Sequence, residues 1–277
     1  MNRLFVAYKP KGVVCNHFLS RLKRKYSDKK AGFSGTLDPF AQGVLIVAFG
    51  QFTKLFRFLN KAPKTYRATL WLGAYSPTLD SEKIERVQTL MAFHPDSVKI
   101  AVESMVGAIT YLPPKYSAKK VEGKRAYALA RDDKDFELNA ITSQVYACHV
   151  VHYVHPFLTF EISISEGGYV RSIGALIAKK LGFEGCLSAL ERLSEGVFVY
   201  EDEKPLNPLE CINLPLNAYL GEKDDILLGR KLLRENFEIT EEGVYCIVID
   251  EKLSIIEMCN DEVNYLLNSI SLEVSPC

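Results

Sequence analysis

Residues 31–45 read AGFSGTLDPFAQGVL, a run of small, turn-forming residues that leads to a single carboxylate, Asp38. A proline follows the carboxylate, and the apolar segment 44–49 then reads as a buried strand. Asp before Pro is common in structural turns, so the turn alone is only moderately informative. A lone acid fixed at the end of a core strand nevertheless makes Asp38 the first candidate for a functional carboxylate.

The composition is that of a globular protein without a membrane segment. Of the 277 residues, 48% are hydrophobic and 25% charged, and the longest apolar run, 44–49, falls far short of the ~20 residues that span a bilayer. The N-terminal sequence MNRLFVAYKPKG turns basic too soon for a signal peptide. The seven cysteines form no C-x-x-C pair, which favours reduced thiols over disulfides or zinc. We therefore expect a cytoplasmic protein.

The net charge of zero conceals a strong asymmetry along the chain. Residues 1–131 contain 23 Lys and Arg against 8 Asp and Glu, whereas residues 132–277 contain 11 against 26. Two basic runs, at 21–30 and 115–125, lie in the first half, and the second is interleaved with tyrosines. Basic residues with aromatic neighbours suit RNA, whose phosphates and unstacked bases are both contacted. The alternative for each run is an ordinary solvated face.

The sequence pattern predicts an α+β fold with a mixed or antiparallel sheet flanked by helices. The helices are expected after Asp96, whose side chain would cap the first turn, and over 171–181, where Gly182 would end the second helix. Prolines at 205–215 suggest a boundary, followed by a small β-rich appendage. The predicted strands are 3–8, 44–49, 64–72, 144–154, 157–165, 244–249 and 253–257.

Several kinds of chemistry lack support in the sequence. His149, His152 and His155 lie in a strand-like segment, where the period of two would direct His152 away from the other two, so a metal site is not expected. No G-x-x-x-x-G-K-[ST] or G-x-G-x-x-G motif is present, so no nucleotide cofactor is expected.

Five ordered blocks carry a family resemblance. Residues 32–45 match the pattern G-H-x-G-x-L-D-P-x-A-x-G-[VM]-L except at the histidine. The other blocks are Lys9-Pro10-x-Gly12, Lys64-x-Tyr66, the segment 113–127 (PPKYSAKKVEGKRAY) and Gly168-Tyr169-Val170-Arg171-Ser172. Over residues 9 to about 198 the chain thus resembles the TruB family of bacterial tRNA pseudouridine-55 synthases.

The resemblance implies isomerisation of uridine 55 in the T-arm loop of tRNA to pseudouridine, without cofactor or metal. Asp38 would be the catalytic carboxylate, acting on a flipped-out uridine. Arg171 would pair with Asp38, and Tyr66 would stack on the uracil and assist in removing its C5 proton. The resemblance assigns contacts with substrate or RNA to six further residues, Lys9, Phe33, Asp80, Lys120, Arg125 and Tyr169.

The sequence departs from the family pattern at two places. Phe33 replaces the histidine that is thought to fill the gap left by the flipped base; phenylalanine can still act as a wedge but donates no hydrogen bond. Leu190-Glu191-Arg192-Leu193 replaces L-R-R-T, which puts an acid where a base is expected. We expect weaker positioning of the RNA but intact chemistry.

The expected organisation is a catalytic domain over 1–211, with an RNA-contacting insertion at about 113–140, and a small, reduced or divergent PUA-like domain over 212–277. The protein is expected to act on tRNA as a monomer. Two alternatives remain open: a tRNA-binding or tRNA-folding protein that has lost catalysis, and a guide-dependent ribosomal RNA enzyme. Intact Asp38, Tyr66 and Arg171 argue against the first, and the short acidic C-terminal segment argues against the second.

Overall fold

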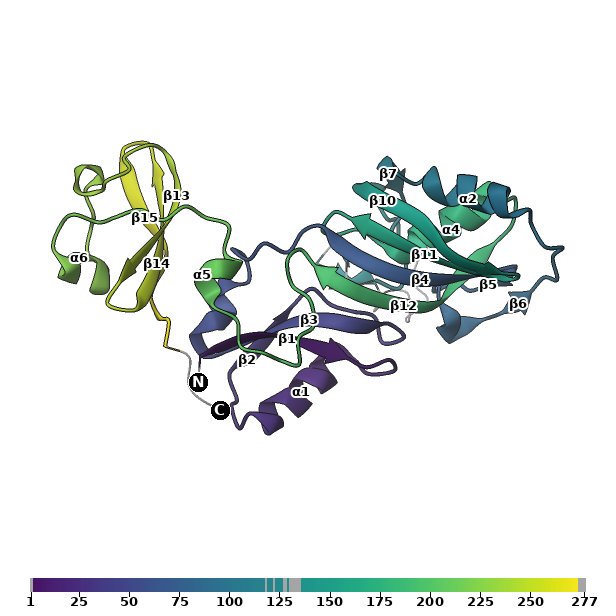
Figure 1. The fold of residues 1–277 in the computed structure, drawn as a ribbon, viewed down its shortest axis with the longest axis horizontal. Helices are drawn as coiled ribbons and strands as arrows, with labels where there is room; N and C mark the ends of the chain where they lie inside the picture. Colours follow the sequence, from purple (N-terminus) through teal and green to yellow (C-terminus); the bar gives the residue numbers. More distant parts are fainter. Residues whose placement is uncertain (1, 118, 122, 127–128, 130–135, 274–277) are drawn as a thin grey trace.

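The computed structural model of the chain describes residues 2–117, 119–121, 123–126, 129 and 136–273. Figure 1 shows an elongated molecule in which one large twisted sheet carries helices, and a separate small sheet lies at the end remote from β7. None of the helices in the described part of the chain is long and apolar enough to cross a bilayer.

The large sheet has eight strands, and its order is β1-β3-β12-β4-β11-β10-β7, with β2 also paired to β3. The pairings are antiparallel except the short parallel contact between β12 and β3. The predicted α+β fold with a mixed sheet is therefore confirmed. The strands are β1 (Arg3–Lys9), β2 (Ala31–Ser34), β3 (Gln42–Phe49), β4 (Lys64–Leu72), β7 (Gly107–Tyr111), β10 (Ile141–Val154), β11 (Phe157–Ile164) and β12 (Gly185–Glu195).

Helices α2 (Pro95–Glu103) and α4 (Val170–Lys180) cover one face of the β4, β11 and β10 region, as Figure 1 shows. Their apolar sides bury Val98, Ile173 and Ile177 against Leu70 and Phe160 of the sheet. Helix α1 (Cys15–Lys25) lies beside β1 and β2. The remaining elements are η1 (Gly50–Leu55), β5 (Ala74–Tyr75), η2 (Ser81–Lys83), β6 (Arg86–Val87), β8 (Lys120–Val121), β9 (Lys124–Arg125), α5 (Pro208–Cys211), α6 (Lys223–Leu227), η3 (Arg234–Asn236), β13 (Gly243–Ile249), β14 (Lys252–Cys259) and β15 (Glu262–Ser271).

Most predicted elements are present, and the helix near Asp96 needs a correction. Its N-cap is His94, whose Nδ1 accepts a hydrogen bond from the Asp96 N–H, so Asp96 lies in the first turn and does not cap. The helix ends at Glu103. Pro95 explains the earlier start, because its fixed φ suits the first helical position and its missing N–H is not needed there.

The small sheet, β13-β14-β15, packs on the main sheet through a shared apolar core. Leu253, Ile255 and Ile270 lie in one buried cluster with Leu4 and Ile46 of β1 and β3. The C-terminal unit therefore covers the face of β1 and β3 that α1 leaves open.

Candidate active site

The turn at 35–38 connects β2 to the segment before β3 and is held from several sides. Gly35 has φ +65°, and a Cβ there would lie 2.7 Å from Lys64 Nζ, so the position requires glycine. The Arg192 guanidinium donates to the Gly35 carbonyl at 3.0 Å, and the Ala41 N–H donates to the Asp38 carbonyl at 3.1 Å. These contacts fix the backbone on both sides of the Asp38 side chain.

The prediction that Lys9 contacts RNA is wrong for its side chain. Lys9 has no exposed surface, and its ammonium donates to the backbone carbonyls of Pro10, Val13 and Ala41 at 2.6–2.9 Å. Burial lowers the pKa of Lys9, and the charge of Asp38 opposes that shift. The side chain therefore supports the loops around Asp38 and is not available to a phosphate.

Arg171 joins the predicted catalytic carboxylate to the interior of the protein. It stands in the first turn of α4 with 4% of its surface exposed, and its Nε lies 2.9 Å from Asp38 Oδ2. Nη1 donates to the Thr78 carbonyl at 2.8 Å and lies 3.2 Å from Asp80 Oδ2, while Nη2 donates to the Tyr116 carbonyl at 2.9 Å. Each of the three guanidinium nitrogens thus has a protein partner.

The expected contact of Asp80 with RNA is also wrong. Asp80 is 3% exposed, and its carboxylate faces Arg171 and accepts from Thr78 Oγ1 at 2.5 Å and from the Glu82 N–H at 3.0 Å. Its role is to hold the far side of the Arg171 guanidinium, so Asp80 acts on Asp38 through Arg171.

Burial raises the pKa of Asp38, and the nearby charge of Asp80 adds to the rise. Arg171, by ion pairing and hydrogen bonding, and Lys9 oppose this shift. Its cationic neighbours therefore favour the ionised form of Asp38, against the effect of burial.

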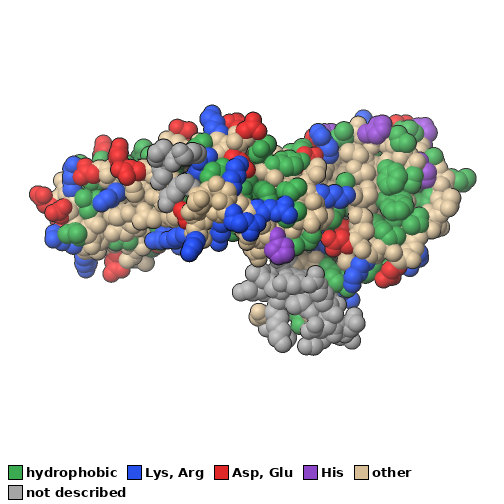
Figure 2. Space-filling model, turned by 90° about the horizontal axis from the view of Figure 1, so that it is seen from below, with side chains coloured by type: hydrophobic (Ala, Val, Ile, Leu, Met, Phe, Trp, Pro, Cys, Tyr) green, Lys and Arg blue, Asp and Glu red, His purple; other side chains and the backbone are tan. Residues whose placement is uncertain are grey.

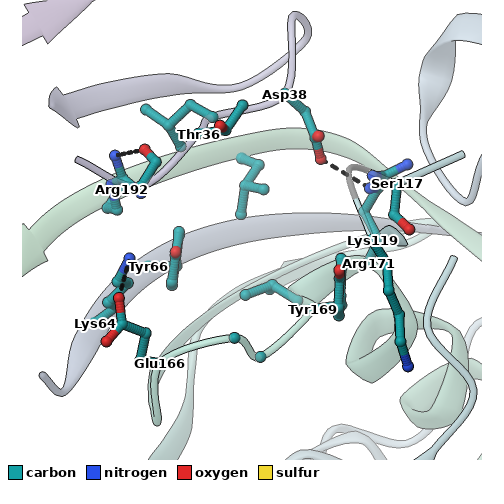
Figure 3. Close-up of a pocket in the computed structure, with 16 residues that line it drawn as sticks. Thr36, Asp38, Lys64, Tyr66, Ser117, Lys119, Glu166, Tyr169, Arg171 and Arg192 are labelled. Carbon is teal, nitrogen blue, oxygen red and sulfur yellow. Dashed lines mark hydrogen bonds and ion pairs between the residues drawn. The ribbon is translucent and has the colours of Figure 1, made fainter. Parts of the chain in front are cut away.

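Asp38 and Arg171 border a cavity of about 340 Å³. Figure 3 shows it between this ion pair on one side and Tyr66, Lys64 and Arg192 on the other. The lining residues are Gly35, Thr36, Leu37, Asp38, Lys64, Tyr66, Ser117, Lys119, Glu166, Gly167, Gly168, Tyr169, Val170, Arg171, Leu190 and Arg192.

Tyr66 and Tyr169 are both in this lining, as their predicted contacts with substrate require. Tyr66 is 8% exposed, and burial raises the pKa of its phenol, so the neutral form is favoured. Tyr169 precedes α4, and its N–H donates to the Tyr111 hydroxyl at 2.9 Å. The cavity thus presents one aromatic ring from β4 and one from the start of α4.

A buried ion cluster beneath the cavity escaped sequence reasoning. Glu195 is fully buried, with Arg192 Nη2 at 2.6 Å and Lys64 Nζ at 3.1 Å from its carboxylate. The family pattern includes Lys64 and Arg192 but does not indicate their shared acid, because Glu195 reaches Lys64 only through the pairing of β12 with β4. Gly35 is the residue in the sequence that could have indicated this ion cluster, because its lack of a side chain leaves room for Lys64 and Glu195.

Three other predicted contact residues lie elsewhere. Phe33 is half-buried in β2, packs on the main core, and is not in the cavity lining. Lys120 and Arg125 face each other as partners in the β8–β9 hairpin, but their side chains, and Tyr127, lie outside what the structure describes. Glu191, the acid at the second departure from the family pattern, accepts a 2.6 Å hydrogen bond from Tyr8 Oη.

The histidines of β10 and of the turn after it are absent from the lining of this cavity. His155 hydrogen-bonds to Tyr153 Oη at 3.0 Å and to the Leu90 carbonyl at 2.9 Å. Across the described ranges no group of three or more His, Cys, Asp or Glu side chains could hold a metal ion.

Basic side chains gather outside the cavity. Figure 2 shows a band of Lys and Arg across the middle of the face seen from below, the side on which α1 lies in Figure 1. Helix α1 places Arg21, Arg24 and Lys25 at the surface, and Lys29 and Lys30 follow it. This band gives the molecule a positive surface suited to a polyanion.

Comparison with known proteins gives consistent matches. Residues 23–170 match the model of the TruB family pseudouridylate synthase (N terminal domain). Two relatives named tRNA pseudouridine synthase B, from Campylobacter curvus (strain 525.92) and Sulfurimonas denitrificans (strain ATCC 33889 / DSM 1251), are 53% and 54% identical over 270 and 271 residues. Each alignment covers 98% of this chain and 99% of the relative.

The fold also matches a solved structure, that of a Cbf5-Nop10-Gar1 complex, with a TM-score of 0.68 and 19% identity. The match covers 97% of this chain and 84% of the other. The shared fold, together with the family match and the identity to full-length relatives, shows that the chain belongs to the TruB family of pseudouridylate synthases.

Proposed function

We propose that the protein isomerises uridine 55 in the T-arm loop of tRNA to pseudouridine, with Asp38 as the catalytic carboxylate. The supporting relatives are tRNA pseudouridine synthases B over nearly their whole length. The observation that carries the assignment of the site is the 2.9 Å ion pair of Asp38 and Arg171 at a cavity that also contains Tyr66.

The isomerisation needs no outside reactant. The bond between ribose C1′ and uracil N1 breaks, the base turns, and C5 bonds to C1′ while its proton leaves and N1 gains one. Asp38 would either attack C1′ or take the C2′ proton, and both roles require an ionised, well-positioned carboxylate. Arg171 supplies both conditions by fixing Asp38 and favouring its charged form.

Tyr66 is assigned to stacking on the uracil. Its ring lines the cavity, and the raised pKa keeps the phenol neutral at physiological pH, which disfavours a phenolate base. Assistance in removing the C5 proton would then require a partner to take the phenol's own proton.

The uridine must leave its stack to reach Asp38, at a cost of a few kcal/mol. Phe33 is proposed as the wedge that takes its place, acting from β2 beside the cavity rather than inside it. The basic band over α1 would hold the backbone of the tRNA, and Lys119 in the lining offers a cation nearer the target nucleotide.

We further propose a catalytic domain over 1–211, with an RNA-contacting insertion at about 113–140 that includes Lys120 and Arg125, and a PUA-like domain over 212–277. The protein would act in the cytoplasm as a monomer. The shared core of the small sheet with β1 and β3 supports a C-terminal unit that is fixed to the catalytic domain.

The direct test uses a T-arm stem-loop transcript labelled with tritium at C5 of uridine. The wild-type protein should release tritium without added metal or nucleotide, and chemical mapping should place pseudouridine at the position equivalent to 55. Tight binding without release would support the non-catalytic alternative and would end the proposal.

A further inference from the structure

The Ser117 hydroxyl is an unused polar group in the wall of the cavity. Ser117 is 3% exposed, and its Oγ has no hydrogen-bond partner. The structure describes a few buried side-chain polar atoms that lack a hydrogen-bond partner. Of these, Ser117 Oγ is the one that belongs to a residue of the cavity lining. A buried hydroxyl without a partner loses its hydration and gains nothing in return, so such groups are rare in folded proteins.

The surroundings of Ser117 place this hydroxyl at the reacting end of the cavity. The preceding residue, Tyr116, gives its carbonyl to Arg171 Nη2, and Arg171 holds Asp38 through Nε. Figure 3 shows Ser117 beside Arg171, on the side of the cavity opposite Tyr66. A ligand that meets Asp38 therefore also comes near Ser117.

The two guanidinium groups of the lining cannot take the place of this hydroxyl. Arg171 is committed to Asp38, Asp80 and two backbone carbonyls, and Arg192 is committed to the Gly35 and Val44 carbonyls and Glu195. The ribose of the target nucleotide must approach Asp38 with C1′ and C2′, whichever reaction follows. The polar group carried by C2′ is the 2′-hydroxyl, which both donates and accepts hydrogen bonds, as serine does.

We propose that Ser117 Oγ hydrogen-bonds to the 2′-hydroxyl of the target uridine and thereby orients the ribose on Asp38. A phosphate is the less favourable partner, because it would carry a negative charge toward Asp38, whose cation, Arg171, is already paired with two carboxylates. The proposal rests on the proposed function and adds to it a contact that distinguishes RNA from DNA at the target nucleotide.

The first test separates a ligand contact from a structural role. Ser117→Ala removes a hydroxyl that has no partner in the free protein, so Tm should stay the same or rise. The control is Ser254→Ala in the C-terminal sheet, where an equally buried hydroxyl donates to Asn268 Oδ1 at 2.9 Å and accepts from the Ser269 N–H. The control should lower Tm and leave turnover unchanged, whereas Ser117→Ala should lower kcat/KM about fivefold to tenfold.

The second test identifies the ligand atom. Stem-loops with uridine or 2′-deoxyuridine at the target position are bound to Asp38→Asn protein, which prevents turnover, with and without Ser117→Ala. We expect each change alone to weaken binding about fivefold to tenfold, and both together to weaken it no further than one. If the losses of affinity from Ser117→Ala and from 2′-deoxyuridine multiply in the doubly changed complex, the 2′-hydroxyl assignment is overturned. Unchanged binding and unchanged turnover on Ser117→Ala would also overturn it. Failure of the wild-type protein to release tritium would instead end the proposed function, so the two failures are distinguishable.

Discussion

Asp38 must be ionised to act, yet burial raises its pKa. Because protonation removes the active form, kcat/KM should fall as the pH falls through this raised pKa, above the range of an ordinary aspartate. Arg171 opposes the rise, so Arg171→Gln should move the acid limb to higher pH and lower the maximal rate at least about 100-fold. Single-turnover rates between about pH 5 and pH 8 test this. An acid limb that stays in place would show that Arg171 does not tune Asp38.

The same arginine also has a structural partner, and the two roles can be separated. Arg171→Gln leaves Asp80 buried without its cation, which should reduce the free energy of unfolding by about 3–5 kcal/mol. Adding Asp80→Asn should recover much of this lost free energy of unfolding, because the more deeply buried of the two carboxylates is then neutral. Activity should not recover, since Asp38 still lacks its partner. Recovery of both would mean that Arg171 acts only as a structural residue.

At the level of elements, the alternation of apolar and polar residues made some strands easy to predict, whereas one helix was missed because its sequence is rich in cations. The segment 64–72 alternates buried residues with residues that are at least partly exposed, and it forms β4 over the predicted range. Helix α1 was not predicted, because its many cations were interpreted as an RNA-contacting run or a solvated face, although Phe18, Leu19 and Leu22 form a buried stripe at helical spacing. The Asp38–Arg171 pairing followed from the family resemblance, whereas Glu195 and the buried state of Lys9 depend on contacts between distant segments.

The short parallel contact of β12 with β3 depends on Gly43. Its φ is +114°, and a Cβ there would lie 2.2 Å from the Arg192 carbonyl oxygen. Gly43→Ala should therefore reduce the free energy of unfolding by about 3 kcal/mol or more, combining backbone strain with a clash that backbone atoms cannot relieve. Denaturant unfolding measures this.

Gly182→Ala is the matched control, because Gly182 has φ +88° but no atom within 4 Å of the added Cβ. Strain alone should cost about 1 kcal/mol there. Equal losses in the two variants would show that the close approach of β12 to β3 is not a constraint.

At the scale of the whole molecule, the basic band over α1 is expected to bind tRNA phosphates. Each phosphate contact that is lost should reduce the slope of log K against log salt by about 0.7–0.9. Arg21→Gln with Arg24→Gln should therefore weaken tRNA binding and reduce the slope by up to about 1.8. Lys99→Gln on α2, away from the band, should change neither, and equal effects of the two would refute a localised RNA surface.

Asp38, held by Arg171 at the cavity, is expected to carry out the isomerisation. The most direct measurement compares wild-type and Asp38→Asn protein in single-turnover tritium release from the T-arm stem-loop, with binding of the same RNA measured in parallel. Release is expected from the wild type only, and both proteins should bind the RNA with affinities within a few fold of each other. Release by Asp38→Asn at a rate near that of the wild type would contradict this expectation.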